Sequence, residues 1–230
     1  MSFLINPYIH VTGGGSSVPV LESITTTIEG TSVTTFTADM PSTRPDDDLY
    51  IMLAVKDDDP TIPLEDTTSW VEVQSSKVGT VVRVKSWWKI GSSEPASYSA
   101  TIDSETYIVY VLRISGANAT TPINASALQT STNGTTKTSP TVTTTVDNCL
   151  VIRFSGSNDT TDTYPTQTEY TATPATEQAK NYSFENGTAG ACECAFSTEE
   201  KLTAGATGTA DFTLSASEAG ASITIAIAPA

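Results

Sequence analysis

Apolar and polar residues alternate along much of this chain with the two-residue period of a β-strand. In residues 81–90, Val82 and Val84 alternate with basic residues until Trp87 and Trp88 stand side by side. Neighbouring side chains of a strand point to opposite faces, so adjacent tryptophans indicate either a strand covered on both faces or a β-bulge. Glu94-Pro95 then predicts a turn before the next strand.

Other segments are more continuously apolar. Residues 107–114 form a nearly unbroken run of aromatic and β-branched side chains, which predicts a central strand buried on both faces. Residues 49–55 and 149–154 are similarly apolar, and residues 221–228 place isoleucines on one face. No segment shows sustained helical periodicity, and abundant Thr fits a pleated, half-exposed surface. We therefore predict an all-β fold, an antiparallel β-sandwich of jelly-roll-like architecture with an extended N-terminal arm.

Polar, turn-forming residues separate the predicted strands. Glu29-Gly30 favours the turn of a hairpin between strands at residues 21–28 and 32–38. Residues 118–140 and 156–181 are rich in Thr, Asn, Ser and Asp. We predict both as long surface loops, the first with at most one short strand.

The first 19 residues have the composition of an arm. Apolar side chains dominate positions 3–9, and residues 13–17, GGGSS, form a flexible tether. We expect residues 20–230 to fold as a single β-sandwich domain and residues 1–19 to extend from it. The apolar part of the arm either anchors the protein to a partner or packs on its own domain. The candidate anchor residues are Phe3, Leu4, Ile5, Pro7, Tyr8 and Ile9.

The chain of 230 residues carries a formal net charge of −15. This charge repels nucleic-acid phosphates and anionic membranes, so we predict neither as a partner. No apolar run approaches the length of a membrane span, and the N-terminus lacks the pattern of a signal peptide. Three cysteines form no even disulfide framework, and Cys192 and Cys194 should share one strand face as reduced core residues. These features favour synthesis in a reducing cytoplasm.

Residues suited to catalysis or metal binding are sparse. His10 is the only histidine and lies in the arm, where a catalytic triad is not indicated. Aspartates at 46–48 and 57–59 bracket the strand at 49–55. They offer oxygen ligands for calcium, but without EF-hand spacing, and such residues commonly form solvated turns. We predict no enzymatic activity, no metal and no cofactor.

Four aromatic residues have two interpretations. They could form a sugar-stacking platform, or they could supply buried area in the core, which is the commoner use of large aromatic side chains. The sequence also leaves open a catalytic pair of carboxylates like that of glycosidases, because it does not determine the distances between carboxyl groups. The aromatic residues are Trp70, Trp87, Trp88 and Tyr98.

Three phrases stand out in this order of strands. They are EPASY at residues 94–98, SPTVTTTVDNCLV at residues 139–151, and the alternating strand that closes the chain. Together with the opening FLINPY, they resemble a β-sandwich module of tailed-bacteriophage virion structural proteins. Modules of this family occur on capsid-surface, tail and fibre proteins.

The resemblance implies a non-enzymatic virion structural protein made in the host cytoplasm. We expect a capsid decoration, or cement, protein that binds the major capsid protein or other virion proteins as a homo-oligomer. The alternative is a tail- or fibre-associated module that binds host surface glycans through the loops at 118–140 and 156–181. A tail-tube or baseplate component would differ from the first interpretation only in its neighbours.

Overall fold

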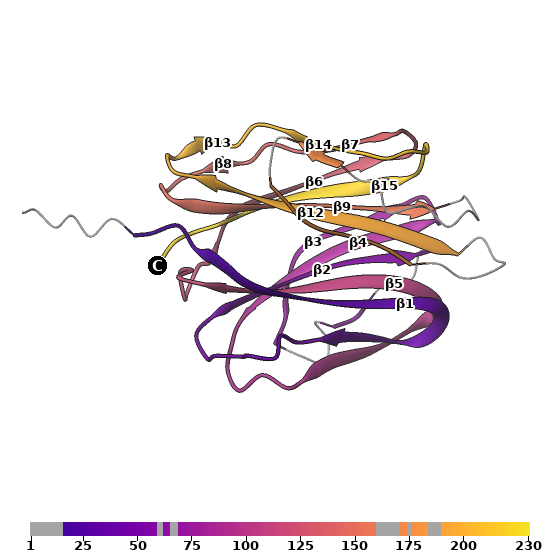
Figure 1. Cartoon of the computed structure of the whole chain (residues 1–230), viewed down its shortest axis with the longest axis horizontal. Coiled ribbons are helices and arrows are strands. Elements are labelled where there is room, and N and C mark those ends of the chain that lie inside the picture. The colour runs from indigo at the N-terminus through magenta and orange to yellow at the C-terminus, as the bar shows by residue number, and fades with distance from the viewer. Residues whose placement is uncertain (1–15, 59–61, 65–68, 160–170, 174–175, 184–189) are drawn as a thin grey trace, which may run out of the picture.

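Two five-stranded antiparallel sheets pack face to face in the computed structural model of the chain (Figure 1). The structure describes residues 16–58, 62–64, 69–159, 171–173, 176–183 and 190–230, and every regular element in these ranges is a strand. The predicted all-β antiparallel sandwich is therefore confirmed. No helix in these ranges has the length and apolar character needed to cross a membrane.

The first sheet comes entirely from the first half of the chain. Its strand order is β1-β5-β2-β4-β3, and all its pairs are antiparallel. The most apolar predicted strands lie at its centre, where both faces are covered. The strands are β1 (Val20–Asp39), β2 (Leu49–Asp57), β3 (Val71–Val78), β4 (Val82–Ile90) and β5 (Ser97–Ser115).

The second sheet comes entirely from the second half, in the order β11-β12-β9-β15-β6. The last strand of the chain lies between two others, which ties the C-terminal residues into this sheet. Each half of the chain forms its own sheet. The fold therefore resembles a jelly roll only in having two antiparallel sheets packed face to face. The strands are β6 (Ile123–Ser131), β9 (Cys149–Asp159), β11 (Thr176–Ser183), β12 (Ala191–Lys201) and β15 (Gly220–Ile227).

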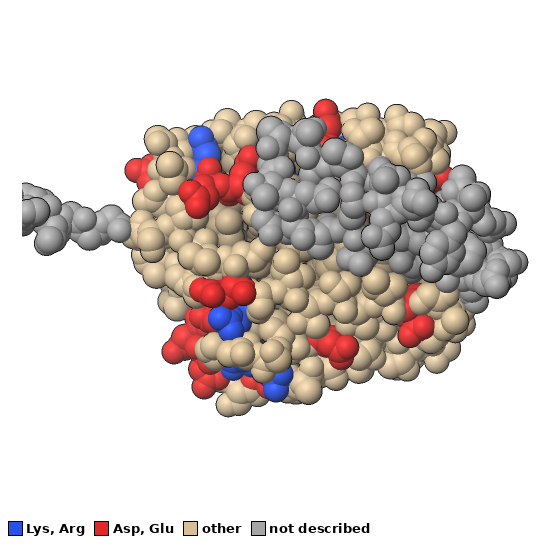
Figure 2. Space-filling model, viewed as in Figure 1, with Lys and Arg blue, Asp and Glu red and all other residues tan. Residues whose placement is uncertain are grey.

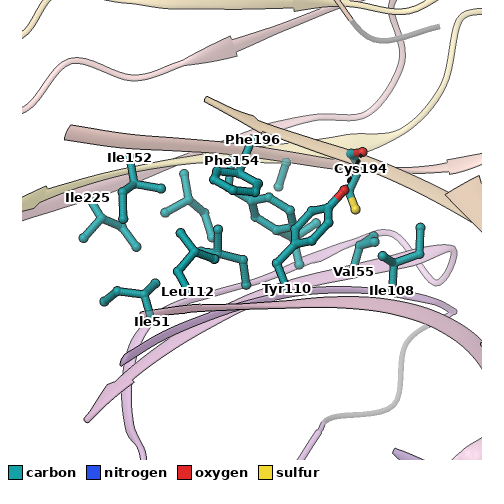
Figure 3. Close-up of a cluster of buried hydrophobic side chains, with 14 of the residues drawn as sticks. Ile51, Val55, Ile108, Tyr110, Leu112, Ile152, Phe154, Cys194, Phe196 and Ile225 are labelled. Carbon is teal, nitrogen blue, oxygen red and sulfur yellow. Dashed lines mark hydrogen bonds between the residues drawn. The ribbon is translucent and has the colours of Figure 1, made fainter. Parts of the chain in front are cut away.

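The main core fills the space between the two sheets (Figure 3). The Tyr110 ring on β5 lies 5.1 Å from Phe196 on β12 and 6.2 Å from Phe154 on β9, measured between centroids. Tyr110 also donates a hydrogen bond of 3.3 Å to the carbonyl of Cys194. The two sheets approach each other closely at Gly156, where an added Cβ would lie 2.9 Å from the Val55 side chain.

Both sheets are also covered on their outer faces. Two small sheets, β10-β14-β7 and β13-β8, cover the second sheet (Figure 1). The C-terminal half of β1 and the N-terminal half of β5 bend beneath the first sheet and form a second core on its outer face (Figure 1). Trp87 faces this outer core, while Trp88 faces the core between the two sheets. Of the two explanations for adjacent tryptophans, coverage of both faces is correct. The covering strands are β7 (Thr136–Ser139), β8 (Thr143–Thr144), β10 (Thr171–Thr173), β13 (Gly205–Ala206) and β14 (Ala210–Thr213).

The hairpin predicted at Glu29-Gly30 is wrong. Residues 21–38 belong to the single strand β1, which pairs with β5 along its whole length. Register shifts between Glu29 and Val33 and between Val33 and Thr35 mark where the paired strands bend. β-Bulges increase local twist, so the polar break in the pattern produces a bend where a turn was predicted.

The structure has strands in the described parts of both predicted surface loops. Residues 118–140 contain β6, an edge strand of the second sheet, and β7, part of its cover. In residues 156–181, β9 continues to Asp159, and β10 and most of β11 follow, while 160–170 and 174–175 lie outside the described residues. A half-exposed strand tolerates Thr, Ser and Asn, so polar composition alone did not separate strand from loop.

Candidate functional site

The predicted anchor, Phe3 to Ile9, and the lone His10 lie outside the described residues, but the point where this arm joins the sandwich is defined. The side chain of Asn148 donates a hydrogen bond of 2.8 Å to the carbonyl of Ser16. The backbone N–H of Asn148 donates to the carbonyl of Leu202 at 3.3 Å. Asn148 has a φ of 58°, a left-handed conformation that asparagine tolerates better than most residues. The root of the arm therefore lies against the residues that lead into β9 and out of β12.

A surface hollow of about 360 Å³ begins directly beside this root, and we call it the end hollow. One wall is the chain that leads from the arm into β1, and the other is formed by β9 and β12. The first wall is apolar, and the second mixes apolar, polar and acidic side chains. The lining residues are Val18, Pro19, Val20, Leu21, Leu150, Thr198, Glu199 and Glu200.

Three large apolar side chains are exposed at this end of the sandwich. Val20 is 54% exposed, Leu202 is 59% exposed and Val146 is 40% exposed, and we call these three residues the end patch. Val20 lines the hollow, and the backbone bond from Asn148 to Leu202 holds the other two segments together. Leu202 and Val20 are the most exposed large apolar residues of the described chain. Sequence reasoning missed the end patch because its members are far apart in the chain.

Acidic side chains gather at the same end of the sandwich (Figure 2). Arg113 on β5 lies 3.2 Å from an Asp48 carboxylate oxygen and 3.6 Å from one of Glu22. The hydroxyl of Ser115 donates to Glu22 at 2.6 Å. Burial raises the pKa of Asp48, while the charge of Arg113 opposes this increase. The acidic residues here have structural partners and still leave the surface negative.

The EPASY phrase forms a buried polar network at the connection between β4 and β5. The Lys89 ammonium lies 2.8 Å from Glu94 Oε1 and donates to the Tyr98 hydroxyl at 2.7 Å. Tyr98 in turn donates to Glu94 Oε2 at 2.5 Å. Burial raises the pKa of Tyr98, and the hydrogen bond to Glu94 raises it further. Every charge here is paired, so the network stabilises the strand connection.

The aromatic residues considered as a sugar platform are mainly packing residues. Trp70 and Trp87 are buried, and Trp70 packs edge-on against Tyr98 with 5.7 Å between ring centroids. Trp88 is partly buried against the inter-sheet core. The core interpretation is confirmed for the two buried tryptophans.

The two aspartate clusters stay at opposite ends of β2. Asp46 accepts a hydrogen bond of 2.6 Å from the backbone of Ser93, which is a turn contact. At the other end, burial and the nearby charge of Glu105 raise the pKa of Asp57 to about 7. Asp59 lies outside the described residues. Within the described ranges, no three His, Cys, Asp or Glu side chains gather as a metal site requires.

A second set of buried charges, which sequence reasoning missed, lies between the second sheet and its cover. Arg153 is 1% exposed and pairs with Glu199 at 2.6 Å, and its Nη2 also donates to the carbonyls of Thr207 and Gly208. The available signal was an arginine within the apolar run CLVIRF. This arginine fastens the covering segment to β9, as a buried cation does when carbonyl and carboxylate oxygens surround it.

The three cysteines are free and buried, as predicted. Cys192 and Cys194 both face the core between the sheets. Burial raises the pKa of the Cys194 thiol well above its usual value, which makes the reactive thiolate scarce. These residues serve packing.

Comparison of the chain with protein-family models, with curated protein sequences and with solved structures finds no match. The resemblance to phage virion modules therefore stays a prediction. The end of the sandwich that carries the arm root, the end hollow and the end patch is the best candidate for a functional surface.

Proposed function

We propose that this protein is a non-enzymatic structural component of a tailed-bacteriophage virion, specifically a capsid decoration protein attached to the major capsid protein shell. In this proposal residues 3–9 anchor the protein and the acidic sandwich faces solvent. The observation that carries the proposal is the arm root at one end of the sandwich, beside exposed apolar side chains. A body whose two most exposed large apolar side chains, Val20 and Leu202, lie at one end is suited to attachment through that end.

Charge supports this division of roles. Residues 1–15 contain no Asp, Glu, Lys or Arg, whereas the whole chain carries a net charge of −15. An uncharged apolar arm can bind a protein surface without the repulsion that the acidic body would meet. The same repulsion between bodies keeps free copies apart, while many weak attachments on a symmetric shell add together.

The buried charges support a structural role. Lys89 has Glu94 and Tyr98 as partners, and Arg153 has Glu199 and two carbonyls. Lys137 on β7 donates to the carbonyls of Gly134 and Glu218. Arg153 and Lys137 join segments that are distant in the chain, and Lys89 fixes the connection between β4 and β5, as expected of groups that hold covers and connections in place.

Deletion of residues 1–12 tests the anchor. The truncated protein should keep its thermal unfolding transition but lose co-sedimentation with shells prepared without the native protein. A full-length variant with Phe3, Leu4 and Ile5 changed to serine separates loss of apolar contact from loss of length. Attachment of both variants at the level of the native protein would contradict the anchor.

The copy number of the protein relative to major capsid protein in purified particles tests the location. A ratio near one supports decoration of the capsid lattice. A few copies per particle would move the assignment to the tail or fibre, and absence from particles would contradict a virion role altogether.

The glycan-binding alternative is not favoured by the fold. One of its two proposed recognition loops, residues 118–140, consists largely of β6 and β7. Binding of the isolated protein to host-surface polysaccharide would nevertheless support this alternative, because glycan binding does not require a capsid shell.

A further inference from the structure

We infer that residues 3–9 dock on the end hollow and end patch of their own chain when the protein is free. The end hollow and end patch would then be the resting site of the arm. This inference concerns the isolated protein and does not depend on a capsid role. Its occupant is a defined apolar segment of the same polypeptide.

The length of the arm allows this fold-back. The carbonyl of Ser16 is fixed 2.8 Å from Asn148, at the edge of the end patch. Residues 10–15 link this point to Ile9 and span at most roughly 20 Å when extended. Their three glycines permit the reversal of direction that docking requires. Leu202 is adjacent to the same root, because its carbonyl accepts the backbone hydrogen bond of Asn148.

The chemistry of the surface matches the segment. The end hollow offers the apolar side chains of Val20, Leu21 and Leu150, and Leu202 and Val146 add exposed apolar surface at the same end. The candidate anchor supplies a phenylalanine, a tyrosine, a leucine and two isoleucines. Burying such side chains against exposed valine and leucine is favourable in proportion to the apolar area removed from water.

Charge selects the arm over the end of a second copy. Glu199 and Glu200 line the end hollow, Glu199 is paired with Arg153, and Asp147, next to Asn148 in the chain, adds a further carboxylate. Two sandwich ends in contact would bring these carboxylates together, whereas residues 1–15 bring none. A tethered arm is also present at an effective concentration on the order of millimolar. Docking within one chain therefore precedes docking between chains in dilute solution.

Limited proteolysis of the full-length protein tests the inference. Chymotrypsin cleaves after Phe3, Leu4 and Tyr8, and intact-mass spectrometry identifies the shortened chains. Replacing Leu202 with serine should raise the rate of these cleavages roughly tenfold, the factor that corresponds to losing burial of one leucine. Leu202 is 59% exposed, so the substitution leaves the core intact.

Val81→Ser is the matched control. Val81 is 39% exposed and lies at the opposite end of the sandwich, where its carbonyl accepts a hydrogen bond from Asp58. This variant should be cleaved in the arm at the rate of the native protein. Equal cleavage of Leu202→Ser and native protein would overturn the inference.

Two further measurements distinguish docking within one chain from docking between chains. Arm cleavage should not change across a dilution series, and protection that increases with protein concentration would overturn the inference in favour of a second copy. Hydrogen exchange at residues 146–150 and 198–202 should be faster in a variant that lacks residues 1–12. Unchanged exchange there would show that the arm does not rest on this surface.

Discussion

The ammonium nitrogen of Lys89 lies 2.8 Å from Oε1 of Glu94, and the two side chains are only 7% and 0% exposed. Lys89 is near the end of β4, and Glu94 is the first residue of EPASY. Their contact fixes the connection that leads into β5. The phrase most specific to the phage resemblance is therefore explained by a structural contact, independently of what the protein binds.

Glu94→Gln should reduce the free energy of unfolding by about 3 kcal/mol, because it leaves a buried ammonium without its counter-charge. Denaturant titration followed by tryptophan fluorescence measures the change. Glu22→Gln is the control, since Glu22 lies 3.6 Å from Arg113, is 35% exposed, and its loss leaves Arg113 paired with Asp48. We expect the control to cost less than about 1 kcal/mol. Equal effects of the two variants would contradict the importance of burial.

Gly156→Ala should destabilise the sandwich by about 1–3 kcal/mol, the usual cost of overpacking a core. The new methyl group would lie 2.9 Å from Val55 and 3.0 Å from Val84 on the opposite sheet. Combining it with Val55→Ala, which removes one of the crowding atoms, Cγ2 of Val55, should cost less than the sum of the two single changes. Strict additivity in this double-mutant cycle would argue against close approach of the sheets at Gly156.

Asp57 should make stability depend on pH. Its pKa is about 7 in the folded protein, against a usual value of 3.8, because of burial and the charges of Glu105 and Asp58, with Lys56 opposing. Between these values the folded state holds a proton that the unfolded state has lost. The contribution of Asp57 to stability is therefore complete at low pH and is lost as the pH rises to about 7.

The Asp57→Asn variant isolates this effect. When the pH is lowered from about 8 to about 5, the free energy of unfolding of the native protein should rise relative to that of the variant. Asp103→Asn, at an exposed position of β5, serves as the control. A difference that stays constant over this range would contradict the raised pKa of Asp57.

The cysteines should be unreactive in the native protein. Burial raises the pKa of Cys194 and of Cys149, and all three thiols are withdrawn from solvent. Ellman's reagent should detect almost no thiol at neutral pH before denaturation and three equivalents after it. Rapid reaction of the native protein would contradict the burial of these residues.

Some elements could be predicted from the sequence because local periodicity decided them. Residues 49–55, 107–114 and 149–154 are apolar on both faces, and all became central strands. The cysteine pair two residues apart had to share one face, as it does. Other elements were misread for the same local reason. Residues 123–131 look like a loop because a half-exposed edge strand needs little apolar surface.

The sequence by itself determined the fold class, the central strands and the apolar, uncharged character of the arm, since these depend on residue type and period. Only the tertiary structure decided the continuous bend of β1 with β5, the assignment of each half of the chain to its own sheet, and the end patch. These features join residues such as Val20, Val146 and Leu202. No local pattern records such contacts, because they arise only when distant segments pack together.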